Sequence, residues 1–238
     1  MILMFAAALA AAGPTCPADT TVPALVCRAL AAGKAGRHAE GAEAFEKAAA
    51  VTPASDPAQA RMFAAAGNSW LSAGQPARAA AAIDKALAPN NMEPVQRGLA
   101  LLDRARAAEA RGDLKTARAK VGEAARTISE DPYLWFFSAA LAVREDDLPT
   151  AKSSINRALA LAPDSPEVMF EAGHIAKAAG EDAKARDYWS SAAARDPRGP
   201  AGKAAREALG LMDVPLTVTN QVAVRPDGDG EGQDRNER

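Results

Sequence analysis

Small and bulky apolar residues recur along this chain with a period of 34 residues. The segment that begins at Pro132 aligns with the one that begins at Pro166, and Ala139 then falls on Gly173. Within each period the apolar positions lie mostly three or four residues apart, which indicates helices and not strands. A period of this length is typical of a repeat architecture in which each unit is one pair of helices.

The alignment predicts five repeat units and a short capping helix. The last three units share one register. The second unit lies before them, separated by four extra residues, and the first unit is degenerate. A stack of helix pairs leaves its last apolar face uncovered, so a closing helix is expected. The expected units are 22–55, 60–93, 98–131, 132–165 and 166–199 with a cap at 201–211, and the expected helix pairs are 24–33 with 37–51, 59–73 with 76–88, 94–111 with 114–129, 133–145 with 148–161, and 166–179 with 182–195.

Residue sizes within each unit follow fixed columns. The last unit carries Gly173 at column 8, Gly180 at column 15 and Trp189 at column 24. This pattern resembles the tetratricopeptide repeat (TPR), in which small residues let two antiparallel helices approach and glycine permits the turn between them. The fourth unit departs from it, with Asp146 in place of the turn glycine. The resemblance implies an all-α, right-handed superhelical solenoid of antiparallel helix pairs over residues 22–211.

The composition agrees with an all-helical chain and argues against nucleic acid as a partner. Alanine carries most of the 48% hydrophobic content, aromatic residues make up only 5%, and alanine is the strongest helix former. The formal net charge is −2. Proteins that bind nucleic acid concentrate lysine and arginine on one face or tail, and no such excess is present here.

An uncharged apolar segment, Ile2–Ala12, lies at the amino terminus. A helix of this length rises about 16 Å, roughly half of the ~30 Å hydrocarbon core of a bilayer, so no integral membrane span is expected. The segment favours a signal peptide over residues 1–15 and a periplasmic or secreted protein. The alternative is the alanine-rich first helix of a cytoplasmic protein, because no lysine or arginine precedes the apolar run.

The two cysteines, Cys16 and Cys27, lie just after this segment. In an exported protein such a pair is most simply explained as one disulfide, which would clip the mature amino terminus onto the first helix. The alternative is two unpaired thiols, with Cys27 packed as a small apolar residue.

The resemblance also implies where a partner would bind. In TPR arrays the first helix of each unit lines a concave groove, chiefly through columns 2, 5, 9, 12 and 13, so we expect a protein or peptide partner there. An alternative is a solvated groove with binding on another face, and a second is a structural scaffold that self-associates through its terminal helix pair. The predicted groove residues are Arg61, Asn68, Leu102, Arg106, Glu109, Tyr133, Phe136, Arg144, Phe170, His174 and Lys177.

No catalytic, metal or cofactor site is expected. The two histidines, His38 and His174, fall in units far apart in a stack and have no cysteine or histidine at ligand spacing. The three tryptophans fall on repeat columns that pack the core. The sequence therefore predicts a protein that is not an enzyme.

The repeat pattern stops after the capping helix. Residues 212–238 end in a stretch rich in glycine and charged residues, with no continuation of the helical columns. We expect this segment to be a flexible charged tail.

Overall fold

The computed structural model describes residues 16–213, so the expected signal peptide and the tail from residue 214 onward lie outside the described residues. The described part forms eleven α-helices and no strand. None of these helices combines the length and the hydropathy needed to cross a bilayer. The helices are α1 Val22–Lys34, α2 His38–Ala50, α3 Pro57–Ser72, α4 Pro76–Leu87, α5 Pro94–Glu109, α6 Leu114–Ala124, α7 Pro132–Arg144, α8 Leu148–Leu161, α9 Pro166–Ala178, α10 Asp182–Arg195 and α11 Pro200–Asp213.

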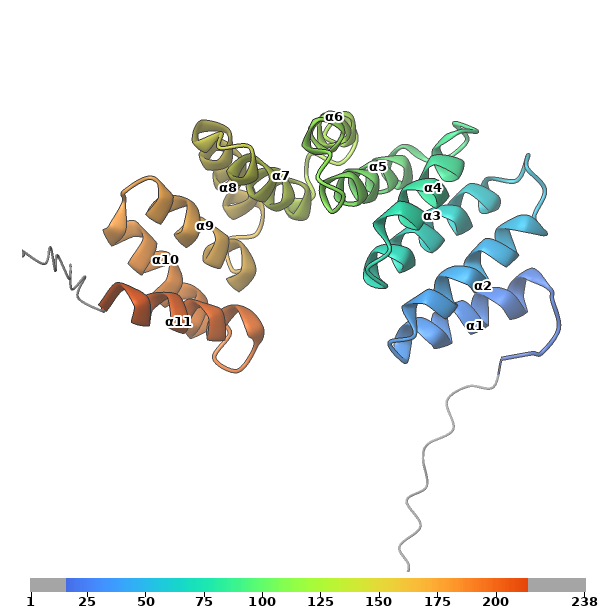
Figure 1. The fold of residues 1–238 in the computed structure, drawn as a ribbon, viewed down its shortest axis with the longest axis horizontal. Helices are drawn as coiled ribbons and strands as arrows, with labels where there is room; N and C mark the ends of the chain where they lie inside the picture. Colours follow the sequence, from blue (N-terminus) through green and yellow to red (C-terminus); the bar gives the residue numbers. More distant parts are fainter. Residues whose placement is uncertain (1–15, 214–238) are drawn as a thin grey trace, which may run out of the picture.

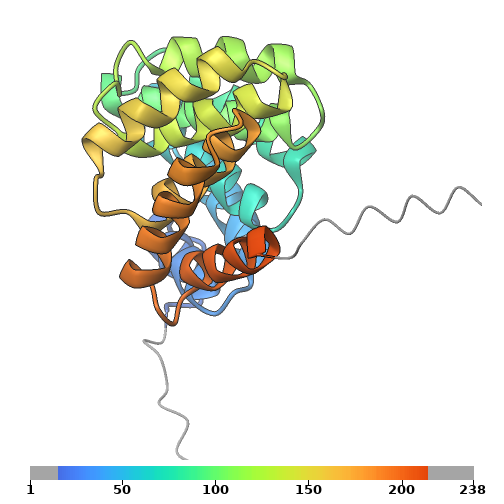
Figure 2. The ribbon, with the colours of Figure 1, turned by 90° about the vertical axis from the view of Figure 1, so that its left-hand side faces the viewer.

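Successive helices pack as pairs, and the pairs stack along an arch (Figure 1). The pairs are α1 with α2, α3 with α4, α5 with α6, α7 with α8, and α9 with α10, while α11 packs against α10 and α9. Figure 2, with α11 in front, shows that successive pairs are turned relative to one another. The predicted all-α solenoid of helix pairs is therefore confirmed.

Local sequence fixes where the first helix of a unit starts. Proline lies at the beginning of α3, α7 and α9, where its missing N–H costs no hydrogen bond. The side chains of Asp56, Asp131 and Ser165 cap these helices by accepting a hydrogen bond from a backbone N–H in the first turn. These local signals set where the first helices begin.

A residue with positive φ separates the two helices of every unit. It is a glycine in four units, with φ between +69° and +79°, and Asp146 with φ 57° in the fourth. Glycine adopts this left-handed conformation freely, and aspartate tolerates it better than most residues do. The departure at Asp146 therefore preserves the turn.

Columns 8 and 24 of a unit meet where its two helices cross. A β-carbon on Gly173 would come within 2.5 Å of Cδ1 of Trp189, and one on Gly67 within 2.9 Å of Cδ1 of Ile83. Side chains in a close-packed interior cannot yield by that much without moving their neighbours. Glycine at column 8 therefore makes room for the bulky residue that fills the pair.

All helix ends but one lie within two residues of the expected positions. The second helix of the third unit was expected to reach residue 129, yet α6 ends at Ala124. The chain leaves the helix through turns that bring Ile128 into the core with α5 and α7. The capping helix ends at Asp213, two residues after the expected end at residue 211, and Met212 packs on the cluster around Trp189.

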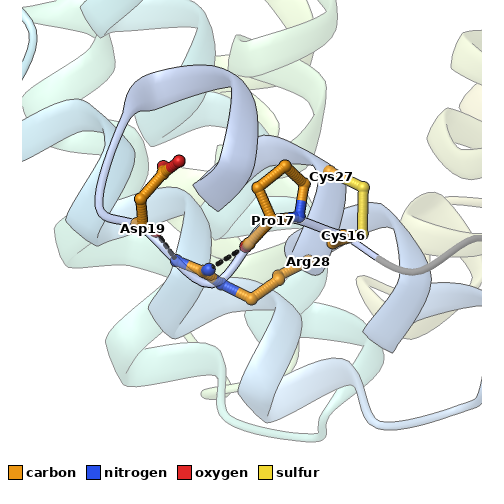
Figure 3. Close-up of a disulfide and its surroundings, with 5 residues drawn as sticks. All are labelled: Cys16, Pro17, Asp19, Cys27 and Arg28. Carbon is orange, nitrogen blue, oxygen red and sulfur yellow. Dashed lines mark hydrogen bonds between the residues drawn. A yellow bond between two sulfur atoms is a disulfide. The ribbon is translucent and has the colours of Figure 1, made fainter.

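A disulfide between Cys16 and Cys27 ties the start of the described chain to α1 (Figure 3). The guanidinium of Arg28 donates to the carbonyl oxygens of Pro17 at 2.5 Å and Asp19 at 2.7 Å. The segment before α1 is thus doubled back along that helix and held by one covalent bond and two hydrogen bonds. Of the two alternatives for the cysteines, the structure contains the disulfide.

Replacing Cys16 and Cys27 together with alanine is expected to lower the free energy of unfolding by about 2 kcal/mol, at the low end of the usual range for disulfides. The effect is modest because the sequence separation is only 11, so the bond closes a short loop. Urea denaturation of both proteins measures the loss. A thiol reductant should destabilise the wild type similarly and leave the double variant unchanged, and a wild type that does not respond to reductant would contradict the bond.

Candidate functional site

The first helices of the units line the inner side of the arch. Helix α3 contacts α5, and α7 contacts α9, whereas the second helices of successive units share no contact of comparable extent. Elements on the inner side of a curved stack lie closer together than those on the outer side. The concave face is therefore built from α3, α5, α7 and α9, and most of the predicted groove residues lie on its surface.

A hollow of about 260 Å³ opens between α3 and α5. Arg61 and Asn68 line it from α3, and Leu99 and Asp103 line it from α5. Its volume equals about nine water molecules at ~30 Å³ each, enough for one side chain of a bound peptide. Arg61 is exposed, and no hydrogen bond or ion pair within residues 16–213 holds its side chain.

A line of polar contacts crosses the face from α3 to α7. Asn68 Nδ2 donates to Asp103 Oδ2 at 3.0 Å, and Arg106 Nη1 donates to Asp103 Oδ1 at 2.8 Å. The guanidinium carbon of Arg106 also lies 5.7 Å from the centre of the Tyr133 ring, within cation–π range. Three predicted groove residues from three units are thus joined in one network, and Asp103, which the sequence analysis did not single out, connects Asn68 with Arg106.

Two other charged candidates pair within the chain. Arg144 of α7 forms an ion pair with Glu109 of α5, and Lys177 Nζ lies 2.9 Å from Asp182 Oδ1. Exposed pairs of this kind contribute about 0–1 kcal/mol to stability. A charged ligand could therefore replace either contact at little cost to the fold.

Aromatic rings mark the half of the face formed by α7 and α9. The rings of Tyr133 and Phe136 stack with their centres 5.9 Å apart, and Phe170 meets His174 edge-on at 4.5 Å. Partial burial lowers the pKa of the His174 imidazole, which favours its uncharged form. Tyr133 is exposed and the two phenylalanines are half-buried, so these rings offer apolar surface to a ligand.

Leu102 was predicted to line the groove, and this prediction is wrong. Its side chain is 2% exposed and packs in the core cluster with Ala105 and Leu134. The small alanines of this cluster leave space that a leucine fills, and burying its apolar surface is favourable. Leu99, one turn earlier on α5, is instead the leucine that faces the hollow.

The repeat columns predict that all three tryptophans pack in the core, and each of them contacts a core cluster. Trp70 is fully buried and Trp189 is 3% exposed. Trp135 is only half-buried, and its indole N–H donates to the carbonyl oxygen of Ser129 at 2.7 Å.

Glu171 on α9 is a further polar residue that the sequence analysis did not anticipate. Its side chain is half-buried, and burial raises the pKa of its carboxyl. A signal was available in the sequence, since Glu171 stands two periods of 34 residues after Asp103 in column 6 of the repeat. Column 6 therefore belongs with the concave face in this chain.

The side chains of the concave face offer polar contacts and apolar surface. Residues 16–213 contain no group of three or more histidine, cysteine or acidic side chains that could hold a metal ion. His38 begins α2 and His174 lies on α9, on opposite sides of the arch in Figure 1. What the concave face offers is a hollow, exposed charges and aromatic rings in one row.

The paired helices, the turn residues and the inner row of first helices define the tetratricopeptide-repeat fold, which the resemblance in sequence predicted. Solved structures with this fold include PilW, a type IV pilus biogenesis factor, with 19% identity, coverage of 77% of this chain and 82% of that one, and a TM-score of 0.67. YrrB, described as a TPR protein with an unusual peptide-binding site, has 17% identity, coverage of 80% and 93%, and a TM-score of 0.57. A thermophilic TPR protein of Thermus thermophilus has 18% identity, coverage of 81% and 100%, and a TM-score of 0.60. No protein-family model and no curated protein matches the sequence.

Proposed function

We propose that this chain is a non-enzymatic binding module that holds a peptide or protein segment on its concave face and acts as a scaffold or adaptor. The observation that carries the proposal is the network from Asn68 through Asp103 and Arg106 to Tyr133, which joins three repeat units beside an open hollow. A peptide-binding site is named for YrrB, a protein with the same fold. An extended concave surface is how helical repeat arrays bind their ligands.

Each part of the face has a distinct role in this proposal. The hollow between α3 and α5 takes an apolar side chain, and the free guanidinium of Arg61 at its edge pairs with a carboxylate of the ligand. Tyr133 and Phe136 supply rigid apolar anchors, the type of residue that dominates binding energy in many interfaces.

Changing Arg106 and Phe136 together to alanine is expected to weaken peptide binding by about 30-fold or more, the effect of losing a contact worth at least ~2 kcal/mol. The probe is a phage-displayed library of random peptides, and fluorescence polarisation of the enriched peptides measures affinity. Arg126→Ala is the control, because Arg126 is exposed and follows α6, outside the inner row of helices. Unchanged binding by the double variant would refute the assignment of the groove.

We further propose that the protein is exported to an oxidising compartment, namely the periplasm or the cell exterior. Two features support this: the apolar amino-terminal segment and the disulfide that follows it. Mass spectrometry of the protein from its native compartment, with and without reductant, tests both cleavage before Cys16 and the bond to Cys27. A full-length, reduced protein would contradict export.

Self-association is a second candidate function. It is favoured by apolar surface at both ends of the array: Leu211 on α11 is 76% exposed, and Leu30 on α1 is 56% exposed beside a hollow of about 850 Å³. Large exposed apolar residues in a contiguous patch often mark protein contacts. Light scattering separates the candidates, because a protein that stays monomeric at high concentration is not a self-assembling scaffold.

A further inference from the structure

Glu171 is a half-buried carboxyl group on α9 that has no hydrogen bond or ion pair within the described part of the chain. Removing a carboxylate from water without a partner costs free energy, which is why burial raises the pKa of this group. An acidic side chain left in this state on a binding face is a candidate for contact with a ligand.

The repeat itself shows what a carboxyl group in this position requires. Asp103 occupies the same column two periods earlier, and its two oxygens each accept a hydrogen bond. One donor is Asn68, in column 9 of the preceding unit, and the other is Arg106, in column 9 of the same unit. The amide and the guanidinium together satisfy this carboxylate.

The residues equivalent to these donors form no hydrogen bond to Glu171. Ala140 stands where Asn68 stands for Asp103, and an alanine side chain donates no hydrogen bond. His174 stands where Arg106 stands, but its imidazole packs edge-on against Phe170 at 4.5 Å and Trp189 at 5.3 Å and makes no hydrogen bond to Glu171. The last unit therefore has an acidic residue in column 6, Glu171, but neither of the two hydrogen-bond donors that Asp103 has.

We propose that Glu171 binds a lysine or arginine side chain of a peptide held on the concave face, an inference that rests on the proposed function. The ligand's ammonium or guanidinium group supplies the donors that Asn68 and Arg106 supply to Asp103. Phe170, the neighbouring residue on α9, offers an aromatic surface to the aliphatic stem and the charge of such a side chain.

The same reasoning gives the bound peptide a direction. Arg61 lies on α3 without a partner in the described residues, and Glu171 lies on α9, so the two unpaired charges have opposite sign and occupy different ends of the face. A ligand with an acidic residue toward α3 and a basic residue toward α9 satisfies both. Charge arrangements of this kind fix the orientation of a partner more than they raise its affinity.

Glu171→Gln tests the proposal, because glutamine keeps the shape of the side chain and removes its charge. Peptides that the full-length wild type enriches from the random library are expected to share a lysine or arginine at one position. Glu171→Gln should weaken their binding by about tenfold or more, whereas Asp187→Asn, which removes an exposed acid from the second helix α10, should not. Replacing the shared basic residue with norleucine should weaken binding to the wild type and have little further effect on Glu171→Gln.

The outcomes separate this inference from the proposed function. Enriched peptides that bind the Arg106 and Phe136 double variant poorly, yet bind Glu171→Gln as tightly as the wild type, would overturn the role of Glu171 and leave the groove intact. A library that enriches no peptide would overturn both. A melting temperature of Glu171→Gln at or above that of the wild type shows that a loss of binding does not come from unfolding.

Discussion

Replacing Trp70 with alanine is expected to lower the free energy of unfolding by about 3–5 kcal/mol. The indole is fully buried in a cluster formed by α2, α3, α4 and α5, so its loss removes apolar contacts and leaves a cavity. It also holds two units together, because its N–H donates to Glu46 Oε1 of α2 at 3.2 Å and the Arg78 guanidinium of α4 covers the ring at 3.4 Å. Urea denaturation followed by far-UV circular dichroism measures the change.

The matched control for this prediction is Trp70→Phe. Phenylalanine retains much of the buried apolar surface but loses the hydrogen bond to Glu46 and part of the ring, so Trp70→Phe should lower the free energy of unfolding by only about 1–2 kcal/mol. A loss below about 1 kcal/mol for Trp70→Ala would show that the first two units do not depend on this contact.

Replacing Gly173 with valine is expected to destabilise the last unit by about 3 kcal/mol, the upper part of the usual range for overpacking. The new side chain would overlap the indole of Trp189, which is 3% exposed and therefore has no free space to enter. Displacing the indole would also break its hydrogen bond to the carbonyl oxygen of Phe170 at 3.1 Å. The same denaturation experiment measures the loss.

Gly122→Ala is the control for a glycine inside a helix. A β-carbon at this position in α6 would meet nothing within 4 Å. Alanine should therefore stabilise the protein by about 0.5–1 kcal/mol, because it restricts the unfolded chain without a clash in the folded one. Equal effects of the two substitutions would show that close helix packing is not what requires glycine at column 8.

The array could be predicted from the sequence because its signals are local and repeat. Proline and capping residues start the first helices, and a residue suited to positive φ ends each of them. The early end of α6 was not predictable in the same way. Helix α6 ends early because Ile128 packs into a core shared with α5 and α7, and no residue near Ala124 indicates that contact in the sequence.

The candidate site could be predicted only as a set of columns on the first helices. The columns found the helices that face inward and placed Asn68, Arg106 and Tyr133 on that face. They misplaced Leu102. A column predicts only the average direction of a side chain, whereas the burial of that side chain depends on the space that the alanines of neighbouring helices leave beside it. They also gave no account of Asp103, whose role appears only when Asn68 of another unit comes within hydrogen-bond distance.

The sequence by itself therefore determined how many helices form in the described part of the chain, where nearly all of them begin and end, and how they pair, because caps, turns and the 34-residue period act within one unit. Only the tertiary structure decided which side of each first helix is buried and which polar groups find a partner. Burial and hydrogen bonding at the concave face depend on side chains that another unit contributes, so Asp103 is satisfied, whereas its equivalent Glu171 finds no partner in the described part of the chain.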